Sequence, residues 1–184
     1  MTNTSLRLLV LAGVLIMVVA ALTGADNAQA TEQRVSTLEA IDDLRQETWR
    51  WQRLMQVRTS PTSYSERSRE NAAYHRWVLA LWRARADRAE QRAKRPPHRS
   101  AWLCLHRHEA INAGGWRART GNGYFGGLQM DLTFQRSYAP ELLRAKGTAD
   151  RWSAIEQMWV AERAVRDGRG FRPWPNSAHA CGLL

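Results

Sequence analysis

The sequence has few cysteines, few acidic residues and little β-strand pattern, and each of these absences disfavours certain classes of protein. It has only 2 cysteines, 17 acidic residues against 27 basic ones, and little of the apolar–polar alternation that predicts β-strands. We see no internal repeat. The longest apolar run, Leu8 to Leu22, is shorter than the roughly 20 residues that a membrane-spanning helix needs. A mostly β fold and a repeat protein are therefore disfavoured. The 184 residues, 44% of them hydrophobic, suffice for one modest domain with accessory segments.

The N-terminus has the order of a secretory signal. Arg7 precedes the apolar run, and small residues lead from it to Ala30. This pattern predicts a signal peptide over residues 1–30, cleaved after Ala30, with a retained membrane anchor as the alternative. In both cases the rest of the chain is exported, and a cleaved signal touches the membrane only transiently. Export argues against nucleic acid as the main partner.

Charge and cysteine content indicate the kind of partner that the protein binds and whether it contains a disulfide. A net charge of +10 favours an anionic partner such as nucleic acid, an acidic membrane or an anionic wall polymer, without choosing among them. An even number of cysteines in an exported chain indicates one disulfide, between Cys104 and Cys181; two free thiols are the alternative. Such a bridge would stabilise the fold by roughly 4–5 kcal/mol in loop-entropy models.

Helical periodicity dominates the chain before residue 95. Apolar residues recur at helical spacing from Val35 to Leu54 and from Tyr74 to Trp82, and a polar linker separates the two stretches. We expect two amphipathic helices, arranged as an αα-hairpin, whose apolar stripes pack together or, alternatively, bind a partner protein. Pro96-Pro97 should end the second helix. The predicted organisation is a helical segment over residues 31–95, a proline-rich linker over 96–100 and a domain over 101–184.

The third segment is also predicted to be mainly α-helical, with a minor β element. Its expected elements are a helix over 101–110 with Ser100 as N-cap, a hairpin within Thr120–Gln129 that turns at Asn122-Gly123, a helix over 132–138, a turn-like piece over 140–147, and a helix from Thr148 through Val165.

Glu109 is the candidate catalytic residue. It lies one helical turn after Leu105 and two after Trp102, near the negative end of the predicted helix. Apolar neighbours and the helix dipole both disfavour the ionised carboxylate. A carboxylic acid that is still protonated near neutral pH can protonate a glycosidic oxygen. The alternative is an ion pair with Arg107 or Arg117.

A glycine-rich, aromatic stretch follows Glu109 and has the composition of a ligand cleft. Glycines let the backbone approach a ligand, aromatic rings offer flat faces to sugars, and polar side chains can bind hydroxyl and N-acetyl groups. The candidate binding residues are Trp116, Thr120, Asn122, Tyr124, Phe125 and Gln129. The alternative is a surface turn whose aromatic residues belong to the core.

These motifs together resemble a known family. Glu109, Gly-Gly-Trp (114–116), Thr-Gly-Asn-Gly-Tyr-Phe-Gly-Gly-Leu-Gln (120–129), Ala-Glu-Arg-Ala (161–164) and Trp-Pro (174–175) before Cys181 are similar to the resuscitation-promoting factor domain. The resemblance covers residues 101–184. It implies a small lysozyme-like, transglycosylase-like fold acting on bacterial peptidoglycan at the cell wall. It also implies that Glu109 is catalytic and that the two cysteines are bridged.

Two departures from the family pattern affect the geometry around Glu109. The first cysteine directly precedes the glutamate in the family, whereas Cys104 lies five residues earlier here. Ala-Ile-Asn-Ala also separates Glu109 from Gly-Gly-Trp. We therefore expect the bridge to be shifted in register and the loop after Glu109 to be longer.

Metal chemistry is not expected, and neither is a cofactor. His108-Glu109 lacks the second histidine of a His-Glu-x-x-His zinc site, because Asn112 occupies that position, and His106 points to another side of the helix. Asp131 is expected to cap the following helix rather than to act as a second catalytic acid. A single carboxylate favours a lytic transglycosylase route; a muramidase, and a module that binds the wall without cleaving it, remain open.

Overall fold

The computed structural model describes the backbone of residues 4–184 and the side chains of residues 28–184. Residues 1–27 of the predicted signal peptide therefore lie outside the described side chains. Within the part of the chain described at that level, we find no helix that is both long and apolar enough to cross a membrane.

The chain divides into two compact units. The first consists of Met1–Glu47 and Pro61–Ala86, and the second of Thr48–Ser60 and Asp87–Leu184. The predicted domain limits at residues 95 and 101 stay a prediction, because these units are defined by contacts and each takes two stretches of chain.

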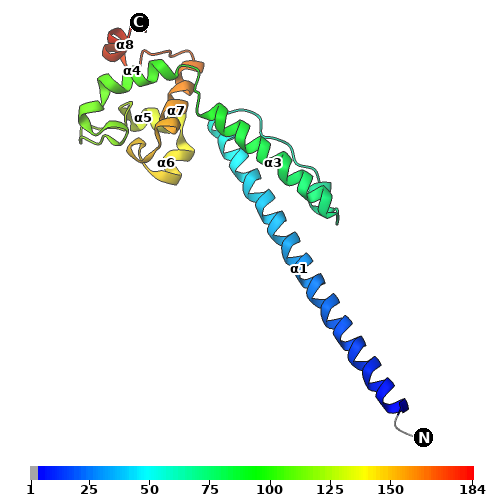
Figure 1. Ribbon diagram of the computed structural model, residues 1–184. Coiled ribbons are helices and arrows are strands. Elements are labelled where there is room, and N and C mark those ends of the chain that lie inside the picture. The colour runs from blue at the N-terminus through cyan, green and yellow to red at the C-terminus, as the bar shows by residue number, and fades with distance from the viewer. Residues whose placement is uncertain (1–3) are drawn as a thin grey trace. The chain divides into compact units, whose positions relative to one another are not determined.

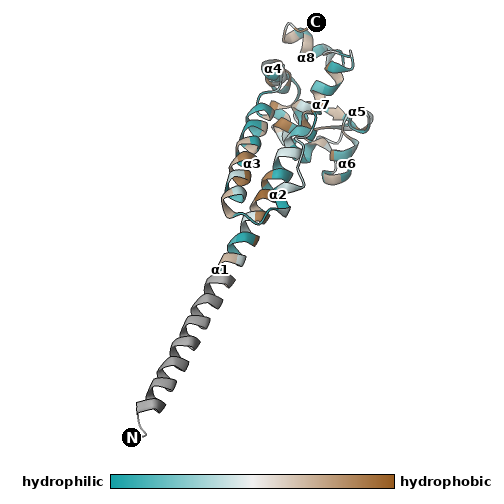
Figure 2. Cartoon of the chain, turned by 90° about the vertical axis from the view of Figure 1, so that its right-hand side faces the viewer, coloured by the Kyte–Doolittle hydropathy of each residue, from teal (hydrophilic) through white to brown (hydrophobic). Residues whose placement is uncertain are grey.

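The first unit contains most of helices α1 (Thr4–Leu54) and α3 (Ala72–Ala93), and the short α2 (Ser65–Ser68) (Figure 1). Figure 2 shows apolar and polar residues mixed along α3, as expected of an amphipathic helix. The buried centre of the first unit includes a cluster of polar side chains. Glu66 accepts hydrogen bonds from Arg45 and from the indole of Trp82, both at 2.9 Å. A buried carboxylate is tolerated here because both donors reach it.

The second unit is helical, with one two-stranded antiparallel sheet. Its helices are α4 (Arg99–Glu109), α5 (Leu132–Tyr138), α6 (Pro140–Lys146), α7 (Ala154–Arg166) and α8 (Pro175–Ala180). Three 3₁₀ turns, η1 (Ile111–Ala113), η2 (Gly115–Arg117) and η3 (Ala149–Arg151), and strands β1 (Tyr124–Phe125) and β2 (Met130–Asp131) complete it. The predicted mainly α fold with a minor β element is confirmed.

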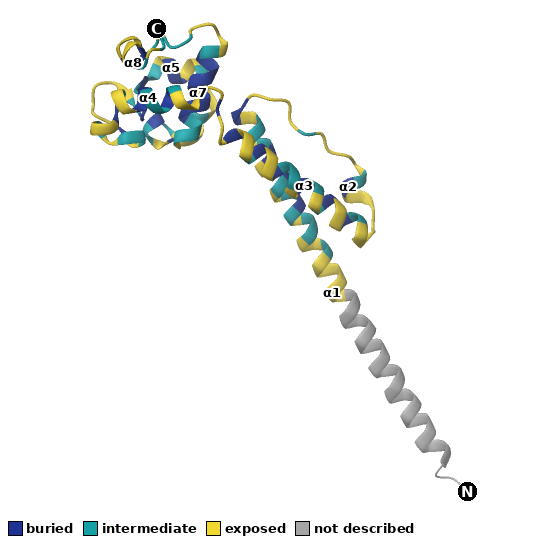
Figure 3. Cartoon of the chain, turned by 45° about the horizontal axis from the view of Figure 1, so that its top comes forward, coloured by how far each residue is buried: buried dark blue, intermediate teal, exposed yellow. Residues whose placement is uncertain are grey.

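The core of the second unit is built on tryptophans. Trp102 of α4 is fully buried and meets Trp174 with ring centroids 5.3 Å apart. Trp174 also packs on Phe134 and donates its indole N–H to the carbonyl of Leu128 at 2.5 Å. Most of α7 is buried as well (Figure 3). Burial of each large side chain contributes roughly 1.5–3 kcal/mol, so these rings dominate the packing of a small domain.

The start of α4 differs from the prediction. The N-cap is His98, not Ser100. Glu162 of α7, only 2% exposed, accepts hydrogen bonds from the backbone N–H of His98 at 2.8 Å, from its ring at 2.9 Å and from the indole of Trp102 at 2.7 Å. A tertiary contact therefore fixes where the helix begins.

The start of α7 also differs from the prediction. Thr148 precedes η3, and the N-cap of α7 is Ser153, which forms a capping box with Glu156. Burial acts to raise the pKa of Glu156, but hydrogen bonds from Lys146, at 2.5 Å, and from Ser153 outweigh it. The pKa is therefore lowered from its ordinary value of 4.5.

An antiparallel bridge between Arg119 and Phe125 encloses the predicted turn at Asn122-Gly123, but the two-stranded sheet lies further along the chain than predicted. Tyr124 pairs with Asp131 and Phe125 with Met130, so the closing turn is at 126–129. Asn122-Gly123 makes an earlier turn, in which the Asn122 side chain accepts the backbone N–H of Tyr124 at 3.1 Å. The sequence suggested one turn, and the chain makes two.

Candidate active site

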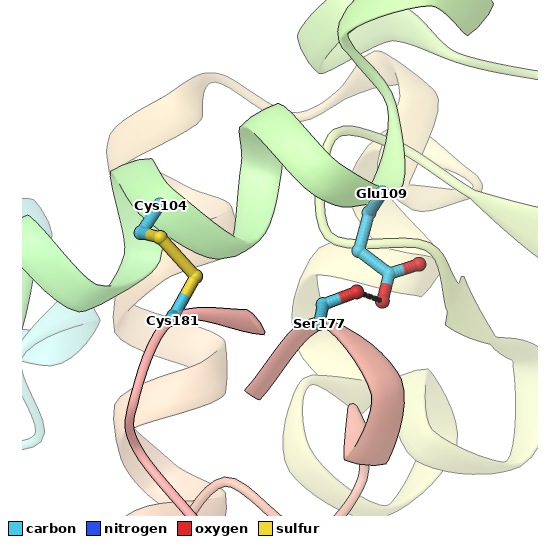
Figure 4. Close-up of a disulfide and its surroundings, with 4 residues drawn as sticks. All are labelled: Cys104, Glu109, Ser177 and Cys181. Atoms are coloured by element: carbon cyan, nitrogen blue, oxygen red, sulfur yellow. Dashed lines mark hydrogen bonds between the residues drawn. A yellow bond between two sulfur atoms is a disulfide. The ribbon is translucent and has the colours of Figure 1, made fainter. Parts of the chain in front are cut away.

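Glu109 is the last residue of α4, and its half-buried carboxylate faces α8 (Figure 4). Ser177 donates a hydrogen bond to Oε1 of Glu109 at 2.5 Å. Among the described residues, the carboxylate has no ion-pair partner and Oε2 accepts no hydrogen bond, so the ion pair with Arg107 or Arg117 does not form. One oxygen is thus fixed by the protein, while the other is left for a ligand.

A disulfide holds α8 against α4. Cys104 and Cys181 are bridged with Cα atoms 6.1 Å apart, five residues before the glutamate, in agreement with the expected shift in register. The bridge and the Ser177–Glu109 hydrogen bond are two links between the same pair of helices (Figure 4). The ring of His108 lies near the bridge, with ligand atoms of all three residues within 4.8 Å of one another. Bridged sulfurs are not thiolates, so this group is not a metal site in the oxidised chain.

The glycine pair at 126–127 is wedged between side chains on two sides. A Cβ on Gly127 would lie 2.5 Å from the ring of Trp116 and 2.6 Å from Nδ1 of His106. Those two rings stack with centroids 4.0 Å apart, and Nδ1 of His106 bonds the carbonyl of Gly127 at 3.0 Å. Only glycine fits here, and His106 lies three residues before Glu109. The glycines therefore allow the loop to pack tightly beside the candidate catalytic helix.

Gln157 fixes the other side of this loop and was not identified from the sequence. Its fully buried side chain accepts the N–H of Gly127 at 2.7 Å and donates to the carbonyls of Trp116 at 2.8 Å and Ala149 at 2.9 Å. A signal was present: Gln157 is at helical spacing from Ala161 and Ala164, small residues that mark a buried face.

The other nearby carboxylates have structural partners. Asp131 accepts the backbone N–H of Phe134 at 2.6 Å and caps α5, as predicted. Glu162 is buried and accepts the hydrogen bonds from His98 and Trp102 described above. Asp131 is thus used as a helix cap through Oδ1, and both oxygens of Glu162 are used in the core.

The six candidate binding residues have different surroundings. Trp116 is partly buried on His106, and Phe125 packs against the core. Asn122 uses its side-chain oxygen in a local turn, and the amide of Gln129 donates to the Gly126 carbonyl at 2.9 Å. Thr120, Asn122 and Tyr124 are exposed. The binding roles of all six residues stay predictions, and direct contact with a ligand is open to the three exposed residues and to Trp116.

Comparison with known proteins shows which family the region around Glu109 is similar to. The model of the family described as "Transglycosylase-like domain" matches residues 97–177. Residues 97–177 are therefore similar to transglycosylase-like domains. Resuscitation-promoting factor RpfE of Mycobacterium tuberculosis is 38% identical over 64 residues, which is 35% of this chain and 34% of that protein. The match thus spans about a third of the relative's length, and no solved structure matches the chain. The predicted similarity of this domain to resuscitation-promoting factors is confirmed.

Segments outside the matched stretch complete the unit that carries the transglycosylase-like domain. Arg163 of α7 donates to the carbonyl of Leu54 at 3.1 Å, and the indole of Trp159 donates to the carbonyl of Ala93 at 2.7 Å. Cys181 lies just beyond the match and closes the domain through the disulfide. The end of α1 is thus a part of this chain's domain surface.

Proposed function

We propose that the protein is a secreted, peptidoglycan-cleaving enzyme that cuts the β-1,4 bond between N-acetylmuramic acid and N-acetylglucosamine. The observation that carries this proposal is the state of Glu109. Its carboxylate is half-buried, hydrogen-bonded on one oxygen to Ser177 and free of ion pairs among the described residues, within a transglycosylase-like domain. A carboxyl group that no cation neutralises can exchange a proton with a substrate.

Glu109 acts first as a general acid and then as a general base. It protonates the glycosidic oxygen, and the C1–O bond breaks as N-acetylglucosamine leaves. The resulting carboxylate takes the proton from the 6-hydroxyl of N-acetylmuramic acid, whose oxygen closes on C1 as a 1,6-anhydro ring. No second carboxylate is needed, which agrees with the structural engagement of Asp131 and Glu162. Attack by water instead gives the muramidase outcome, for which enzymes normally use a carboxylate pair.

The glycine-rich loop is proposed to bind the glycan on both sides of the cut bond. Trp116 and Tyr124 offer ring faces, and Thr120 offers a hydroxyl. Asn122 and Gln129 hold the loop through their local hydrogen bonds and keep one polar atom each for the substrate. Phe125 supports this surface from the core side.

The proposed location is outside the cell, at the wall. The predicted signal peptide supports export, and the net charge of +10 favours attachment to anionic wall polymers. Within the helical segment over residues 31–95, the part that belongs to the first unit, residues 31–47 and 61–86, is proposed to be free for a partner protein, because it lies outside the unit that carries Glu109.

The test is digestion of purified cell walls by wild type and Glu109→Gln, followed as loss of turbidity. We expect wild type to clear the walls and the variant to be inactive while retaining its melting temperature. Mass spectrometry of the products separates the two reactions, because an anhydro end is one water lighter than a reducing end. Binding to walls with no soluble product from wild type would instead establish a non-catalytic wall-binding module.

A further inference from the structure

A cavity of about 980 Å³ lies in the second unit, and Glu109 is not among the residues that line it. One wall is the end of α1, residues 50–56, which the family match does not reach. The remaining lining comes from η2, α6, the end of η3 and α7. Ligand sites commonly enclose about 300–1,000 Å³, so the cavity is large enough for several sugar units.

Three tryptophans line this cavity, and each is held in place. Trp152 is 2% exposed and donates its indole N–H to the Gly147 carbonyl at 2.8 Å, and Trp116 stacks on His106. Trp51 of α1 carries the guanidinium of Arg50 at 4.4 Å from its ring centroid. Trp152 is buried and supports the wall of the cavity, whereas Trp51 and Trp116 are partly exposed. The fixed ring faces of Trp51 and Trp116 suit the C–H faces of a saccharide.

The cavity is also strongly basic. It is lined by six basic and two acidic side chains, and both acids are used in ion pairs, Lys146 with Glu156 and Arg163 with Glu141, each at 2.5 Å. The other basic residues are Arg50, Arg53, Arg117 and Arg151. All four are exposed, and within the described residues none has a carboxylate within 4.0 Å. Guanidinium groups bind carboxylate and phosphate through paired hydrogen bonds, so the unpaired set selects an anion.

We propose that this cavity binds an anionic saccharide, with sugar rings against Trp51 and Trp116 and acid groups against the arginines. The inference rests on the proposed function, because it takes the cell wall as the source of the saccharide. The acid groups are either the carboxylates of peptidoglycan and uronic acids or the phosphates of wall polymers. Trp116 lines the cavity and packs on His106, one turn before Glu109, so a polymer held there lies close to the candidate active site.

The test measures binding of defined oligomers to the full chain by titration calorimetry at about 0.1 M salt. The probes are hexagalacturonate, a mannohexaose that carries phosphates on its 6-hydroxyls, and neutral chitohexaose. We expect both or one of the anionic probes to bind, and Arg53→Gln/Arg151→Gln to weaken that binding about tenfold, or about 1.4 kcal/mol. The matched control is Arg136→Gln/Arg172→Gln, which removes two exposed arginines outside the cavity and should stay within about twofold of wild type. The tighter anionic probe identifies carboxylate or phosphate as the source.

Two results would overturn the proposal: equal binding by the cavity variant and wild type, or binding of chitohexaose as tight as that of the anionic probes. Glu109→Gln separates this inference from the proposed function. That variant should bind the anionic probe as wild type does, because Glu109 does not line the cavity. Loss of wall cleavage with intact binding therefore concerns Glu109, and loss of binding with intact folding concerns the arginines.

Discussion

Ser177→Ala tests whether the contact between α8 and α4 positions the reacting carboxylate. The Ser177 hydroxyl is 2.5 Å from Oε1 of Glu109, and the residue is only 7% exposed, so replacement by alanine removes one oxygen and leaves the packing intact. A hydrogen bond to a charged group contributes roughly 1.5–3 kcal/mol. Because Glu109 is only half-buried, water can replace part of this interaction, and we expect a loss of about 1–2 kcal/mol in transition-state stabilisation.

That loss corresponds to a fall in kcat of about 5- to 30-fold. The assay is release of soluble muropeptides from purified walls, with kcat and KM separated by varying the wall concentration. KM should be unchanged, because the hydroxyl is not predicted to touch the glycan, and the melting temperature should fall by only a few degrees, because a single hydrogen bond is lost. Ser177→Thr keeps the hydroxyl and should restore most of the rate. Unchanged kcat in Ser177→Ala, or a joint fall in kcat and melting temperature that threonine does not rescue, would refute the positioning role.

Three further predictions concern stability, each read from denaturant unfolding. Gly127→Ala should cost about 1–3 kcal/mol, because the added Cβ would lie 2.5 Å from a packed ring, and an unchanged free energy of unfolding would contradict this tight packing. Gly121→Ala meets nothing within 4 Å, so its cost should be that of its positive φ alone, roughly 1–2 kcal/mol. Reduction of the Cys104–Cys181 bridge, which spans 77 residues, should lower the unfolding free energy by about 4–5 kcal/mol, and Cys104→Ser should then be insensitive to reductant. The pKa of Glu156 is lowered in the folded protein, so the stability that its carboxylate contributes is present above about pH 4.5 and is lost as the pH falls through the lowered pKa. Glu156→Gln should therefore be less stable than wild type at pH 7 and should lose less stability on acidification. Parallel profiles of stability against pH for the two proteins would contradict this.

Local patterns in the sequence predicted the helices well and their boundaries less well. Asp131 caps α5 as its position before Leu132 suggested, because an N-cap is decided by neighbours along the chain. The cap of α4 is instead His98, held by a carboxylate 64 residues away. Helical spacing carries no information about such a partner, so boundaries of this kind require the tertiary structure.

The residues of the candidate site also divide into those that the local sequence predicts and those that depend on distant contacts. Glu109 was identified from its local setting, whereas Ser177, 68 residues later, was not. The two cysteines contained a clue. Cys104 and Cys181 are bridged between antiparallel helices. Ser177 lies one turn before Cys181, and Glu109 lies just over one turn after Cys104, so the bridge brings these two residues together. Gln157 was missed because its role depends on the backbone groups that it bonds, and two of these, in Gly127 and Trp116, lie 30 and 41 residues away along the chain.

The central claim is that the side chain of Glu109 transfers the proton that cuts the glycan. The most direct measurement is mass spectrometry of muropeptides released from purified walls by equal amounts of wild type and Glu109→Gln, with circular dichroism to show that both are folded. General acid–base catalysis is worth about 10²- to 10⁴-fold, so we predict that release by the variant falls by at least about 100-fold. Release of the same muropeptides at the wild-type rate by a folded Glu109→Gln protein would contradict the account.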